Sequence, residues 1–415
     1  MSLPRLLAGL EDGSPVSRST HEAIHGPAPR NGVSLIDAAD MAGLRGRGGS
    51  AFPTAVKLRS VAAQRGPRTV LVNAAEGEPM SLKDRVLLER APHLVLDGAR
   101  AAALAVNASA IVVAVREDAL AALDAIQIAV NDLALGRRVT VTGVPVAYLA
   151  GQEGALIRHL GGGPLKPQSV PPRPFERGLQ RRPTLVQNPE TLAHLALIDR
   201  HGPEWFRALG TDGSPGSALI TVSGAVRRPG VQEIAFGTAL EDVLDVAGGA
   251  AEPLRAVLIG GYHGTWIGGD EIAAARLDDE SLARHGSALG AGVIVALGAS
   301  ACPVQELAVA MAWLAGQSAH QCGPCSNGLP ALANLVAAIA AGRAEPGAEQ
   351  RLIRWCSDVT GRGACHLPDG AAGFLASGAR AFAQELVDHM AHGPCAACQR
   401  PLTLATTQPA RRRAA

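Results

Sequence analysis

Hydrophobic residues along the first half of the chain follow two alternating patterns. From residue 34 onward, apolar positions spaced three or four apart take turns with short runs of aliphatic and β-branched residues. The short runs predict strands at 69–72 and 110–115. The predicted helices lie at about 35–41, 54–63, 92–106, 119–133 and 190–197. This order is typical of βαβ units, so we expect an α/β domain with a mostly parallel sheet covered on both faces.

Three segments lack this alternation and suggest the limits of the domain. The first 30 residues are rich in Pro, Gly and Ser without sustained periodicity, which predicts a loosely held arm. Gly-Gly-Gly-Pro and Val-Pro-Pro-Arg-Pro clusters within 161–183 predict a long irregular loop. Residues 211–216 have the composition of a linker. We therefore expect the α/β domain to cover residues 31–210.

The second half of the chain changes pattern twice. Strand-like runs at 218–226, 232–234 and 257–259, with one helical pattern at 239–247, predict a small β-rich domain over 216–300. From residue 301 to 392 every periodic segment is helical, which predicts a helical bundle. The expected helices are at about 304–316, 328–341, 348–357 and 373–389. A tail at 393–415 ends in an Arg-Arg-Arg run that we interpret as a solvated end rather than a binding patch.

Composition narrows the class of protein. The chain has 415 residues, enough for two to four domains, and 38 Lys and Arg residues balance 37 Asp and Glu. This balance argues against nucleic acid or an anionic membrane as a partner. No apolar run reaches the ~18 residues of a membrane span and no secretory signal is evident, so we expect a cytoplasmic protein without direct membrane insertion.

The cysteines are distributed unevenly. Six of the seven lie between Cys322 and Cys398. In a reducing compartment such clustering indicates a metal rather than a disulfide framework. The seventh, Cys302, lies beside a proline on an apolar run and is interpreted as a plain core residue.

A glycine-rich loop precedes the helix predicted at 54–63. The block Gly-Leu-Arg-Gly-Arg-Gly-Gly-Ser-Ala-Phe-Pro-Thr at 43–54 holds four glycines and two arginines. Bare N–H groups at a helix start suit a phosphate, although the spacing is not that of the dinucleotide fingerprint. A tight structural turn is the other interpretation.

A second polar block follows the strand at 69–72. Its sequence, Asn-Ala-Ala-Glu-Gly-Glu-Pro at 73–79, leaves the strand where open α/β sheets place ligands. On its own, a capped loop explains this block equally well.

Together with three further blocks, these two resemble a known family. The further blocks are Lys-Asp-Arg at 83–85, Ala-Tyr-Leu-Ala-Gly-Gln-Glu at 147–153 and Gln-Asn-Pro-Glu-Thr at 187–191. In this order they resemble the flavin-bearing, NADH-binding component of respiratory complex I, which is the F subunit of NADH-quinone oxidoreductase, and the diaphorase subunits of NAD-linked hydrogenases and formate dehydrogenases. The resemblance runs from about residue 31 to 392, and Val-Ser-Gly-Ala-Val-Arg-Arg-Pro-Gly at 222–230 looks like the opening of that family's β-grasp domain.

The resemblance implies a fold and a function. The fold is a Rossmann-like FMN domain, a small β-grasp (ubiquitin-like) domain and a C-terminal helical-bundle iron–sulfur domain. The implied activity is that of an NADH dehydrogenase (diaphorase): FMN takes a hydride from NADH, and a cluster passes single electrons to a protein acceptor. The implied acceptor is a ferredoxin or a thioredoxin-like iron–sulfur subunit. The resemblance also implies that the chain itself lies peripheral to a membrane complex.

The resemblance also implies cofactor-binding residues. Those implied to line the FMN and NAD site are Gly46, Arg47, Gly48, Gly49, Phe52, Lys57, Asn73, Glu76, Gly151, Glu153, Asn188 and Thr191. The chemistry requires no general acid or base, and no His is assigned a catalytic role. NADH and NADPH are not distinguished by these residues.

Three positions near this site depart from the family pattern. Ala75 and Gln152 stand where the family has acids, and Ser60 stands where it has a second aromatic ring beside the adenine. These departures keep an alternative open: a paralogue with the same fold that has lost NADH oxidation and acts as an electron relay or assembly module.

The implied cluster ligands are Cys322, Cys325 and Cys365, with Ala319 where the family has the first of four cysteines. Three thiolates can hold a 3Fe-4S cluster, or a 4Fe-4S cluster whose last iron takes another ligand. The candidates for that ligand are His320, Cys356, Cys395 and Cys398. Two alternatives stay open: reduced thiols without metal, and a zinc site of Cys322 and Cys325 with the tail pair.

Overall fold

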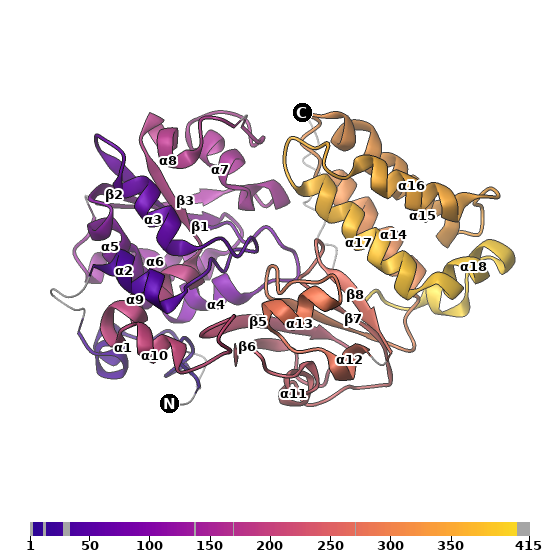
Figure 1. The fold of residues 1–415 in the computed structure, drawn as a ribbon, viewed down its shortest axis with the longest axis horizontal. Helices are drawn as coiled ribbons and strands as arrows, with labels where there is room; N and C mark the ends of the chain where they lie inside the picture. The colour runs from indigo at the N-terminus through magenta and orange to yellow at the C-terminus, as the bar shows by residue number, and fades with distance from the viewer. Residues whose placement is uncertain are drawn as a thin grey trace. The chain divides into compact units, whose positions relative to one another are not determined.

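The computed structural model describes residues 3–10, 14–27, 34–136, 138–168, 170–269 and 271–404. The chain divides into two compact units, shown as a ribbon in Figure 1. The first comprises Met1–Gly77, Ser81–Ile220 and Val231–Thr238. The second comprises Glu78–Met80, Thr221–Gly230 and Ala239–Ala415. The predicted arginine run at 411–413 lies outside the described residues.

A four-stranded sheet forms the centre of the first unit. Its strands are β1 (Arg68–Ala74), β2 (Ala108–Arg116), β3 (Val139–Val144) and β4 (Thr184–Gln187), in the order β3-β2-β1-β4. Every pairing is parallel, which confirms the predicted sheet. Val70, Leu71 and Val72 in β1 are fully buried because helices cover both faces of the sheet.

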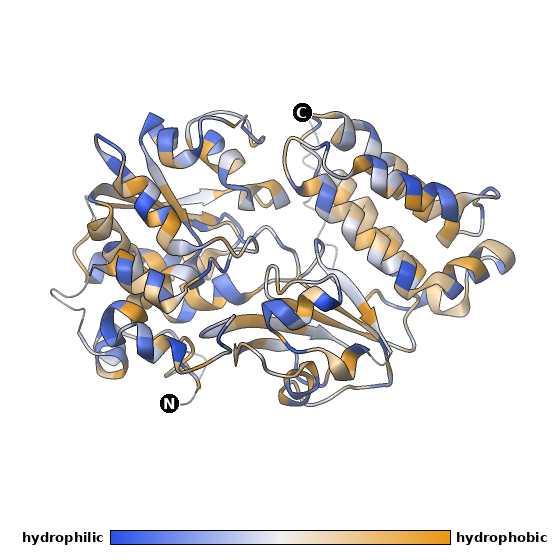
Figure 2. Cartoon of the chain, viewed as in Figure 1, coloured by the Kyte–Doolittle hydropathy of each residue, from blue (hydrophilic) through white to orange (hydrophobic). Residues whose placement is uncertain are grey.

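The helices of the first unit include the five that the sequence predicts, together with others that it does not predict. They are α1 (Arg18–His25), α2 (Leu35–Ala42), α3 (Thr54–Ala62), α4 (Lys83–Arg90), α5 (Pro92–Ala105), α6 (Leu120–Asp132), α7 (Glu153–Leu160), α8 (Pro174–Arg177), α9 (Pro189–His201) and α10 (Pro203–Arg207), with 3₁₀ turns η1 (Tyr148–Gly151) and η2 (Leu179–Arg181). Hydrophobic and hydrophilic residues alternate around the surface helices in Figure 2, as expected for helices with one buried face.

The order of the strands reverses at β1. From β1 the chain moves outward through β2 to β3, and then returns to the other side of β1 as β4. In an open α/β sheet such a reversal leaves a crevice beyond the carboxyl ends of the two strands. The loops that follow β1 and β4 therefore flank the place where a ligand is expected.

Two predictions about irregular segments are wrong. The described part of the N-terminal segment is packed rather than loose: the N–H groups of Arg5, Leu6 and Leu7 all donate to Glu233 Oε2. The carboxylate that orders this segment lies more than two hundred residues further along the chain, so no local sequence pattern reveals the contact. The predicted loop at 161–183 contains α8 and η2, and α8 begins at a proline, which the first turn of a helix accepts.

The second sheet lies further along the chain. Its strands are β5 (Ser217–Gly224), β6 (Gly230–Ala235), β7 (Leu254–Ile259), β8 (Thr265–Gly268) and β9 (Val293–Gly298), in the order β6-β5-β9-β7-β8. The helices around it are α11 (Leu240–Val246), α12 (Glu271–Ala274) and α13 (Asp279–Arg284). The sequence predicts only the first of these helices, because the other two are too short to show periodicity.

Helices complete the second unit. They are α14 (Pro303–Gly316), α15 (Leu329–Ala340), α16 (Ala348–Val359), α17 (Leu367–Ala381) and α18 (Ala383–His392), with the π-helical turn η3 (Pro324–Gly328) and the 3₁₀ turn η4 (Ala396–Gln399). The helix predicted at 373–389 is two helices that meet at the buried Phe382. The Phe382 ring packs edge-on against Trp266, with ring centroids 5.3 Å apart. No helix in the described part of the chain is long and apolar enough to cross a membrane.

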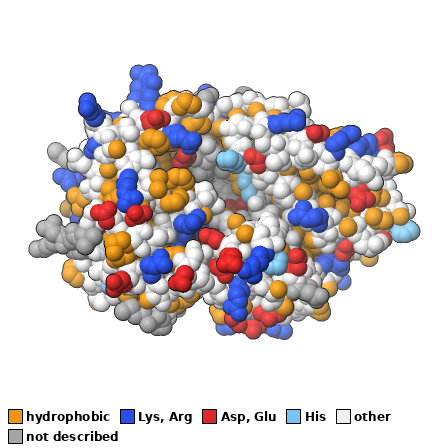
Figure 3. Space-filling model, in the orientation of Figure 1, with side chains coloured by type: hydrophobic (Ala, Val, Ile, Leu, Met, Phe, Trp, Pro, Cys, Tyr) orange, Lys and Arg blue, Asp and Glu red, His pale blue; other side chains and the backbone are white. Residues whose placement is uncertain are grey.

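Surface charges are mixed in sign. Figure 3 shows acidic and basic side chains interspersed on the visible face. This distribution agrees with the formal net charge of +1.

Candidate functional site

Backbone hydrogen bonds join the two ends of the glycine-rich loop, whereas the N–H groups at its tip are exposed. Gly46 N–H donates to Phe52 O at 2.9 Å and Thr54 N–H donates to Leu44 O at 2.9 Å, just before α3 begins. Gly48, Gly49 and Ser50 at the tip are exposed, and within the described residues their N–H groups have no acceptor. Free N–H groups next to a helix start are suited to an anion such as a phosphate.

Arg47 and Thr191 hold this loop in place. Arg47 N–H donates to Thr191 Oγ1 at 2.9 Å, and the buried Arg47 guanidinium donates to Ser217 O at 3.1 Å and lies 4.7 Å from the centre of the Phe236 ring. Both side chains are buried. In this structure they fix the loop against α9, rather than presenting their polar groups at the surface.

The loop after β1 meets the turn before α7. Asn73 Nδ2 donates to Gly151 O at 2.8 Å, and a Cβ added at Gly77 would lie 2.5 Å from Tyr148 O. The backbone at Gly77 therefore approaches η1 more closely than any side chain would permit. Asn73 and Gly151, predicted as parts of one site, are in direct contact.

Glu76 caps a helix. Its carboxylate accepts from Asp84 N at 2.9 Å, from Arg85 N at 3.1 Å and from Ser81 Oγ at 2.7 Å. Burial and the nearby Asp84 carboxylate raise the pKa of Glu76. The N–H groups at the start of α4 stabilise the ionised form against this rise.

Lys57 and Glu153 pair across the site. Lys57 Nζ in α3 lies 3.2 Å from Glu153 Oε2 in α7, and both side chains are partly exposed. This ion pair links the helix that follows the glycine-rich loop to the helix that follows η1.

The positions that depart from the family pattern have structural roles. Gln152 is the N-cap of α7, where its Oε1 accepts from Ala155 N at 2.6 Å. Ser60 Oγ donates to Val56 O within α3 at 2.8 Å. Ala75 is fully buried in a cluster with Leu71. Phe52, in contrast, is 45% exposed and lies in the segment between the loop tip and α3.

A buried ion network next to the crevice is not among the predicted site residues. Lys83 is 3% exposed, and its Nζ lies 2.8 Å from Asp84 Oδ1 and 2.9 Å from Glu190 Oε2. Burial alone would lower the pKa of Lys83, but the two carboxylates outweigh it and raise that pKa. Glu190 also accepts from Leu219 N at 2.8 Å. The signal in the sequence is the charged Lys-Asp-Arg block, whose spacing does not show that Lys83 turns inward.

Asn188 joins this network to α9. As the N-cap of α9 it accepts from Glu190 N at 2.9 Å through Oδ1, and its Nδ2 donates to Asp84 Oδ2 at 2.5 Å. Asn188 follows β4 directly, so the network lies at the carboxyl end of the strand next to β1.

The predicted cluster cysteines are neighbours. Cys325 is buried in η3, where burial and the nearby Cys322 and Cys365 thiols raise its pKa. Three soft sulfur donors in one place fit an iron–sulfur cluster. Ala319 is buried and offers no ligand atom.

The candidates for a further cluster ligand differ in their surroundings. His320 is exposed, with φ of 49°. Cys356 is buried in α16, and burial raises the pKa of its thiol to about 12.

The interpretation of Cys302 as a plain core residue is wrong. Cys302 Sγ lies 3.3 Å from Cys398 Sγ and 3.4 Å from His389 Nε2. The tail pair is therefore grouped with Cys302 and His389, whereas the predicted zinc alternative pairs it with Cys322 and Cys325. His389, Cys395 and Cys398 lie within ten residues of one another, but Cys302 lies more than eighty residues before them, so sequence spacing does not indicate the complete group.

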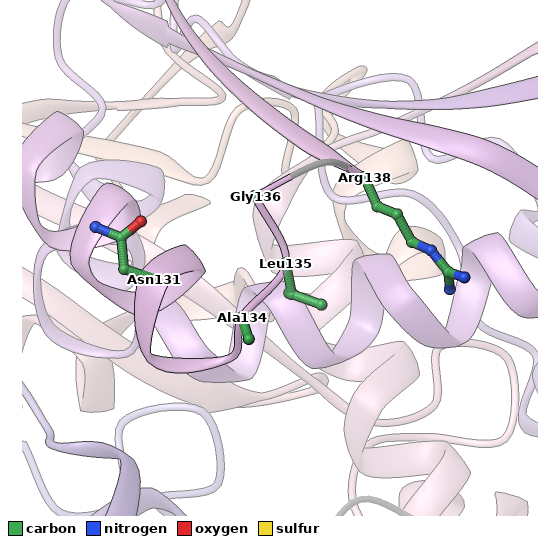
Figure 4. Close-up of a pocket in the computed structure, with 5 residues that line it drawn as sticks. All are labelled: Asn131, Ala134, Leu135, Gly136 and Arg138. Atoms are coloured by element: carbon green, nitrogen blue, oxygen red, sulfur yellow. The ribbon is translucent and has the colours of Figure 1, made fainter.

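A surface pocket of about 630 Å³ lies away from this chemistry. Its lining runs from Asn131 at the end of α6 to Arg138 just before β3, at the amino edge of the first sheet. In Figure 4 the side chains of these two residues point away from each other. Ligands of open α/β sheets bind at the carboxyl edge, so we do not assign this pocket to the site.

Comparison with known proteins agrees with the geometry. Family models match residues 39–197 as the Nuo51 FMN-binding domain, 219–264 as an SLBB domain and 305–389 as the NADH-ubiquinone oxidoreductase-F iron-sulfur binding region. An NADH-quinone oxidoreductase F subunit of Rhizobium meliloti is 32% identical over 91% of this chain and 93% of its own length. The chain belongs to the family of NADH-quinone oxidoreductase F subunits.

Other relatives support this assignment. The NADH-quinone oxidoreductase F subunit of Escherichia coli is 31% identical over 85% of this chain and 83% of its own length. The crystal structure of an NAD+-reducing [NiFe]-hydrogenase in the air-oxidized state matches with a TM-score of 0.83 and 33% identity. That match covers 92% of this chain and 66% of the hydrogenase chain.

Membership of this family confirms the main expectations. The predicted FMN-binding domain and iron–sulfur region are both present, as an NADH dehydrogenase-type oxidoreductase requires. The donors in the chain fit these groups: free N–H groups at a helix start suit the phosphate of FMN, and neighbouring thiols suit the cluster.

Proposed function

We propose that this member of the family oxidises NADH at FMN and passes electrons singly through an iron–sulfur cluster to a protein acceptor. The observation that carries the proposal is that one chain holds both an open glycine-rich loop beside a strand-order reversal and a group of neighbouring thiols. When bound, FMN supplies the conversion between a two-electron hydride and single electrons. The protein's part is to position the reactants, since hydride transfer needs no proton carrier from a side chain.

The cofactor site is proposed to use the carboxyl edge of the first sheet. The N–H groups of Gly48 and Gly49 bind the phosphate, with Gly46 and Arg47 shaping the loop. Asn73 and Gly151 lie where the loop after β1 meets η1, and their contact orders the backbone there. These roles rest on the contacts within the protein and on the family match.

The nucleotide is proposed to stack on Phe52, whose exposed ring is close in sequence to the loop tip. Lys57 and Glu153 fix the side of the site through their ion pair, while Glu76 holds α4. Asn188 and Thr191 act from the start of α9. The proposed set combines residues that touch a ligand with residues that hold those in position.

The second unit is proposed to hold the cluster on Cys322, Cys325 and Cys365, as a 3Fe-4S or a 4Fe-4S cluster. We also propose that the sheet around β7 and β9 is the β-grasp domain and that α14–α18 form the cluster-binding bundle. The sequence-based boundaries at 31–210, 216–300, 301–392 and 393–415 belong to the same proposal. A ferredoxin or a thioredoxin-like iron–sulfur subunit is the proposed acceptor, in the cytoplasm and peripheral to a membrane complex.

Anaerobic addition of NADH to the purified chain tests the proposal. The flavin absorbance at constant protein concentration is expected to bleach, and iron and sulfide analysis is expected to show a cluster. NADPH serves as the matched second donor. A flavin band unchanged by excess NADH in protein with full FMN content would contradict NADH oxidation.

An electron relay or assembly module is the second candidate function. Three residues favour it. Ala75 lacks the acidic group and Ser60 lacks the aromatic ring that the family has near the NADH site, and Ala319 lacks the thiol of a cluster ligand. An FMN-loaded chain that is inert to NADH but is reduced by an iron–sulfur partner protein would support it.

A further inference from the structure

Four metal-ligating side chains meet in the second unit, apart from the proposed cluster cysteines. The ligand atoms of Cys302, His389, Cys395 and Cys398 all lie within 4.8 Å of one another. We propose that these four residues bind a structural zinc ion that fastens the tail to the helices. Neither the family matches nor the proposed electron transfer assigns this site.

The distances fit a single ion. Zinc bonds of ~2.3 Å to sulfur and ~2.0 Å to nitrogen in a tetrahedron place the ligand atoms about 3.5 to 3.8 Å apart. Here the separations scatter about these values: Cys395 Sγ lies 3.7 Å from Cys398 Sγ, and Cys302 Sγ lies 3.3 Å from Cys398 Sγ. His389 Nε2 lies 3.4 Å from Cys302 Sγ and 3.9 Å from Cys398 Sγ. A four-iron cube would stand between its ligands and hold them further apart, so this geometry favours a mononuclear ion.

The chemistry of the donors selects zinc among such ions. Three thiolates and one imidazole form a Cys₃His set, which is a common structural zinc site. All four positions are filled by protein atoms, so no place is left for a reacting water. The site is therefore structural rather than catalytic.

The histidine is oriented as a zinc ligand. His389 Nδ1 lies 3.1 Å from Ala340 O, and because a carbonyl only accepts, the Nδ1 proton donates to it. This hydrogen bond fixes the tautomer that leaves the Nε2 lone pair facing the three sulfurs. His389 is 2% exposed and Cys302 is 4% exposed, so half of the site is shielded from water.

The tail is held by independent contacts on both sides of the pair of cysteines. Before it, a Cβ added at Gly342 would lie 2.5 Å from the Cα of Gly393, so the chain passes close against the end of α15. After it, Thr403 N–H and Leu404 N–H donate to the buried Glu306 at 2.6 and 2.9 Å. These contacts bring Cys395 and Cys398 back to Cys302, the N-cap of α14.

Metal analysis of the full-length protein tests the proposal. The purified chain is expected to contain about one zinc in addition to any cluster iron, since the four ligands form one site. Cys395→Ser, at an exposed ligand, is expected to lose most of the zinc while keeping its iron and FMN. Cys356→Ser is the matched control and is expected to keep the zinc, because Cys356 lies in α16 outside the group.

Several results would overturn the assignment. These are wild-type protein without zinc, zinc that persists in Cys395→Ser, or loss of iron instead of zinc in that variant. An intact Cys395–Cys398 disulfide in anaerobically prepared wild-type protein would also overturn it.

Alkylation of the wild-type chain gives a test that needs no variant. With zinc bound, Cys395 is expected to react slowly with iodoacetamide despite its exposure, and to react rapidly after a chelator removes the metal. Equal rates before and after chelation, in protein shown to contain zinc, would contradict the proposed ligand. FMN content and NADH response are measured separately, so failure of the zinc site and failure of the proposed electron transfer are distinguishable.

Discussion

At the residue scale, Gly48 in the glycine-rich loop shows whether a glycine is required by the packing of the protein or by the approach of a ligand. A Cβ added at Gly48 would lie 3.4 Å from Asn188 Cβ, which is ordinary contact, and Gly48 is exposed. The protein itself therefore does not require glycine at this position. A ligand that approaches the loop backbone does.

We therefore expect Gly48→Val to fold normally and to lose FMN. The added side chain would hold a phosphate away from the N–H groups of the loop tip. Flavin content and thermal unfolding measure the two effects separately. Gly136→Val, at the pocket on the other edge of the sheet, is the control that should keep its flavin. Full FMN occupancy in Gly48→Val would show that the phosphate binds elsewhere.

Lys83 differs from surface cations because its partners are buried with it. Lys83→Met keeps the size of the side chain but leaves Asp84 and Glu190 without their cation, and removing one partner of a buried pair costs about 3–5 kcal/mol. Urea unfolding followed by circular dichroism measures the loss. Arg18→Ala, in a half-exposed pair with Glu22, should change the free energy of unfolding by less than ~1 kcal/mol. Equal effects of the two substitutions would contradict the assigned role of Lys83.

Glu78 gives the second unit a pH dependence of stability. Burial raises the pKa of Glu78 to about 8, although N–H groups of Tyr262 and Met80 oppose the rise. Between its ordinary pKa of 4.5 and 8, the folded chain holds a proton that the unfolded chain has released. The free energy of unfolding therefore falls as pH rises through this window, by about 3 kcal/mol between pH 5 and 8.

Glu78→Gln is expected to remove this part of the pH dependence, because Gln keeps an acceptor for Tyr262 N–H without a titrating proton. Unfolding curves at several pH values between 5 and 8 measure it. Glu241→Gln, on the exposed side of α11, is the control expected to follow the wild type. If the free energy of unfolding of Glu78→Gln falls with pH as steeply as that of the wild type, groups other than Glu78 cause the pH dependence.

At the element scale, the sequence predicts the central strands β1 and β2 but not β3, β4, β8 or β9, nor the contacts made through the backbone. β1 and β2 are aliphatic runs because helices cover both faces of their sheet, so composition alone shows them. The N-terminal segment was not predictable, because its order comes from Glu233 far along the chain. Cys302 was misinterpreted for the same reason: its partners lie more than eighty residues away and follow no fixed spacing.

Two helical glycines have opposite roles. A Cβ at Gly98 in α5 would lie 1.8 Å from Leu192 O in α9, whereas a Cβ at Gly373 in α17 meets nothing within 4 Å. We expect Gly98→Ala to destabilise the first unit by about 1–3 kcal/mol or more, because the two helices must separate. Gly373→Ala should instead stabilise its helix by up to ~1 kcal/mol. Urea unfolding compares the two, and a neutral Gly98→Ala would show that α5 and α9 are less close than described.

At the scale of the whole molecule, the two proposed cofactors belong to separate units, so a variant can remove one of them alone. Cys365→Ser is expected to lose most of the iron, because it removes one of three neighbouring thiols. Its flavin should still bleach with NADH, while transfer to an added iron–sulfur protein acceptor should fall strongly. Unchanged iron in Cys365→Ser would remove that residue from the ligand set.

The unequal distribution of tryptophans, one of which packs against Phe382, gives the flavin-loaded chain two separate optical signals. Trp266, Trp313 and Trp355 lie in the second unit, and Trp205 is the one tryptophan of the first. Intrinsic fluorescence during unfolding therefore follows mainly the second unit, whereas the colour of a bound flavin follows the first. Melting curves that coincide in both signals would indicate one cooperative transition, and curves that separate would show that the units melt independently.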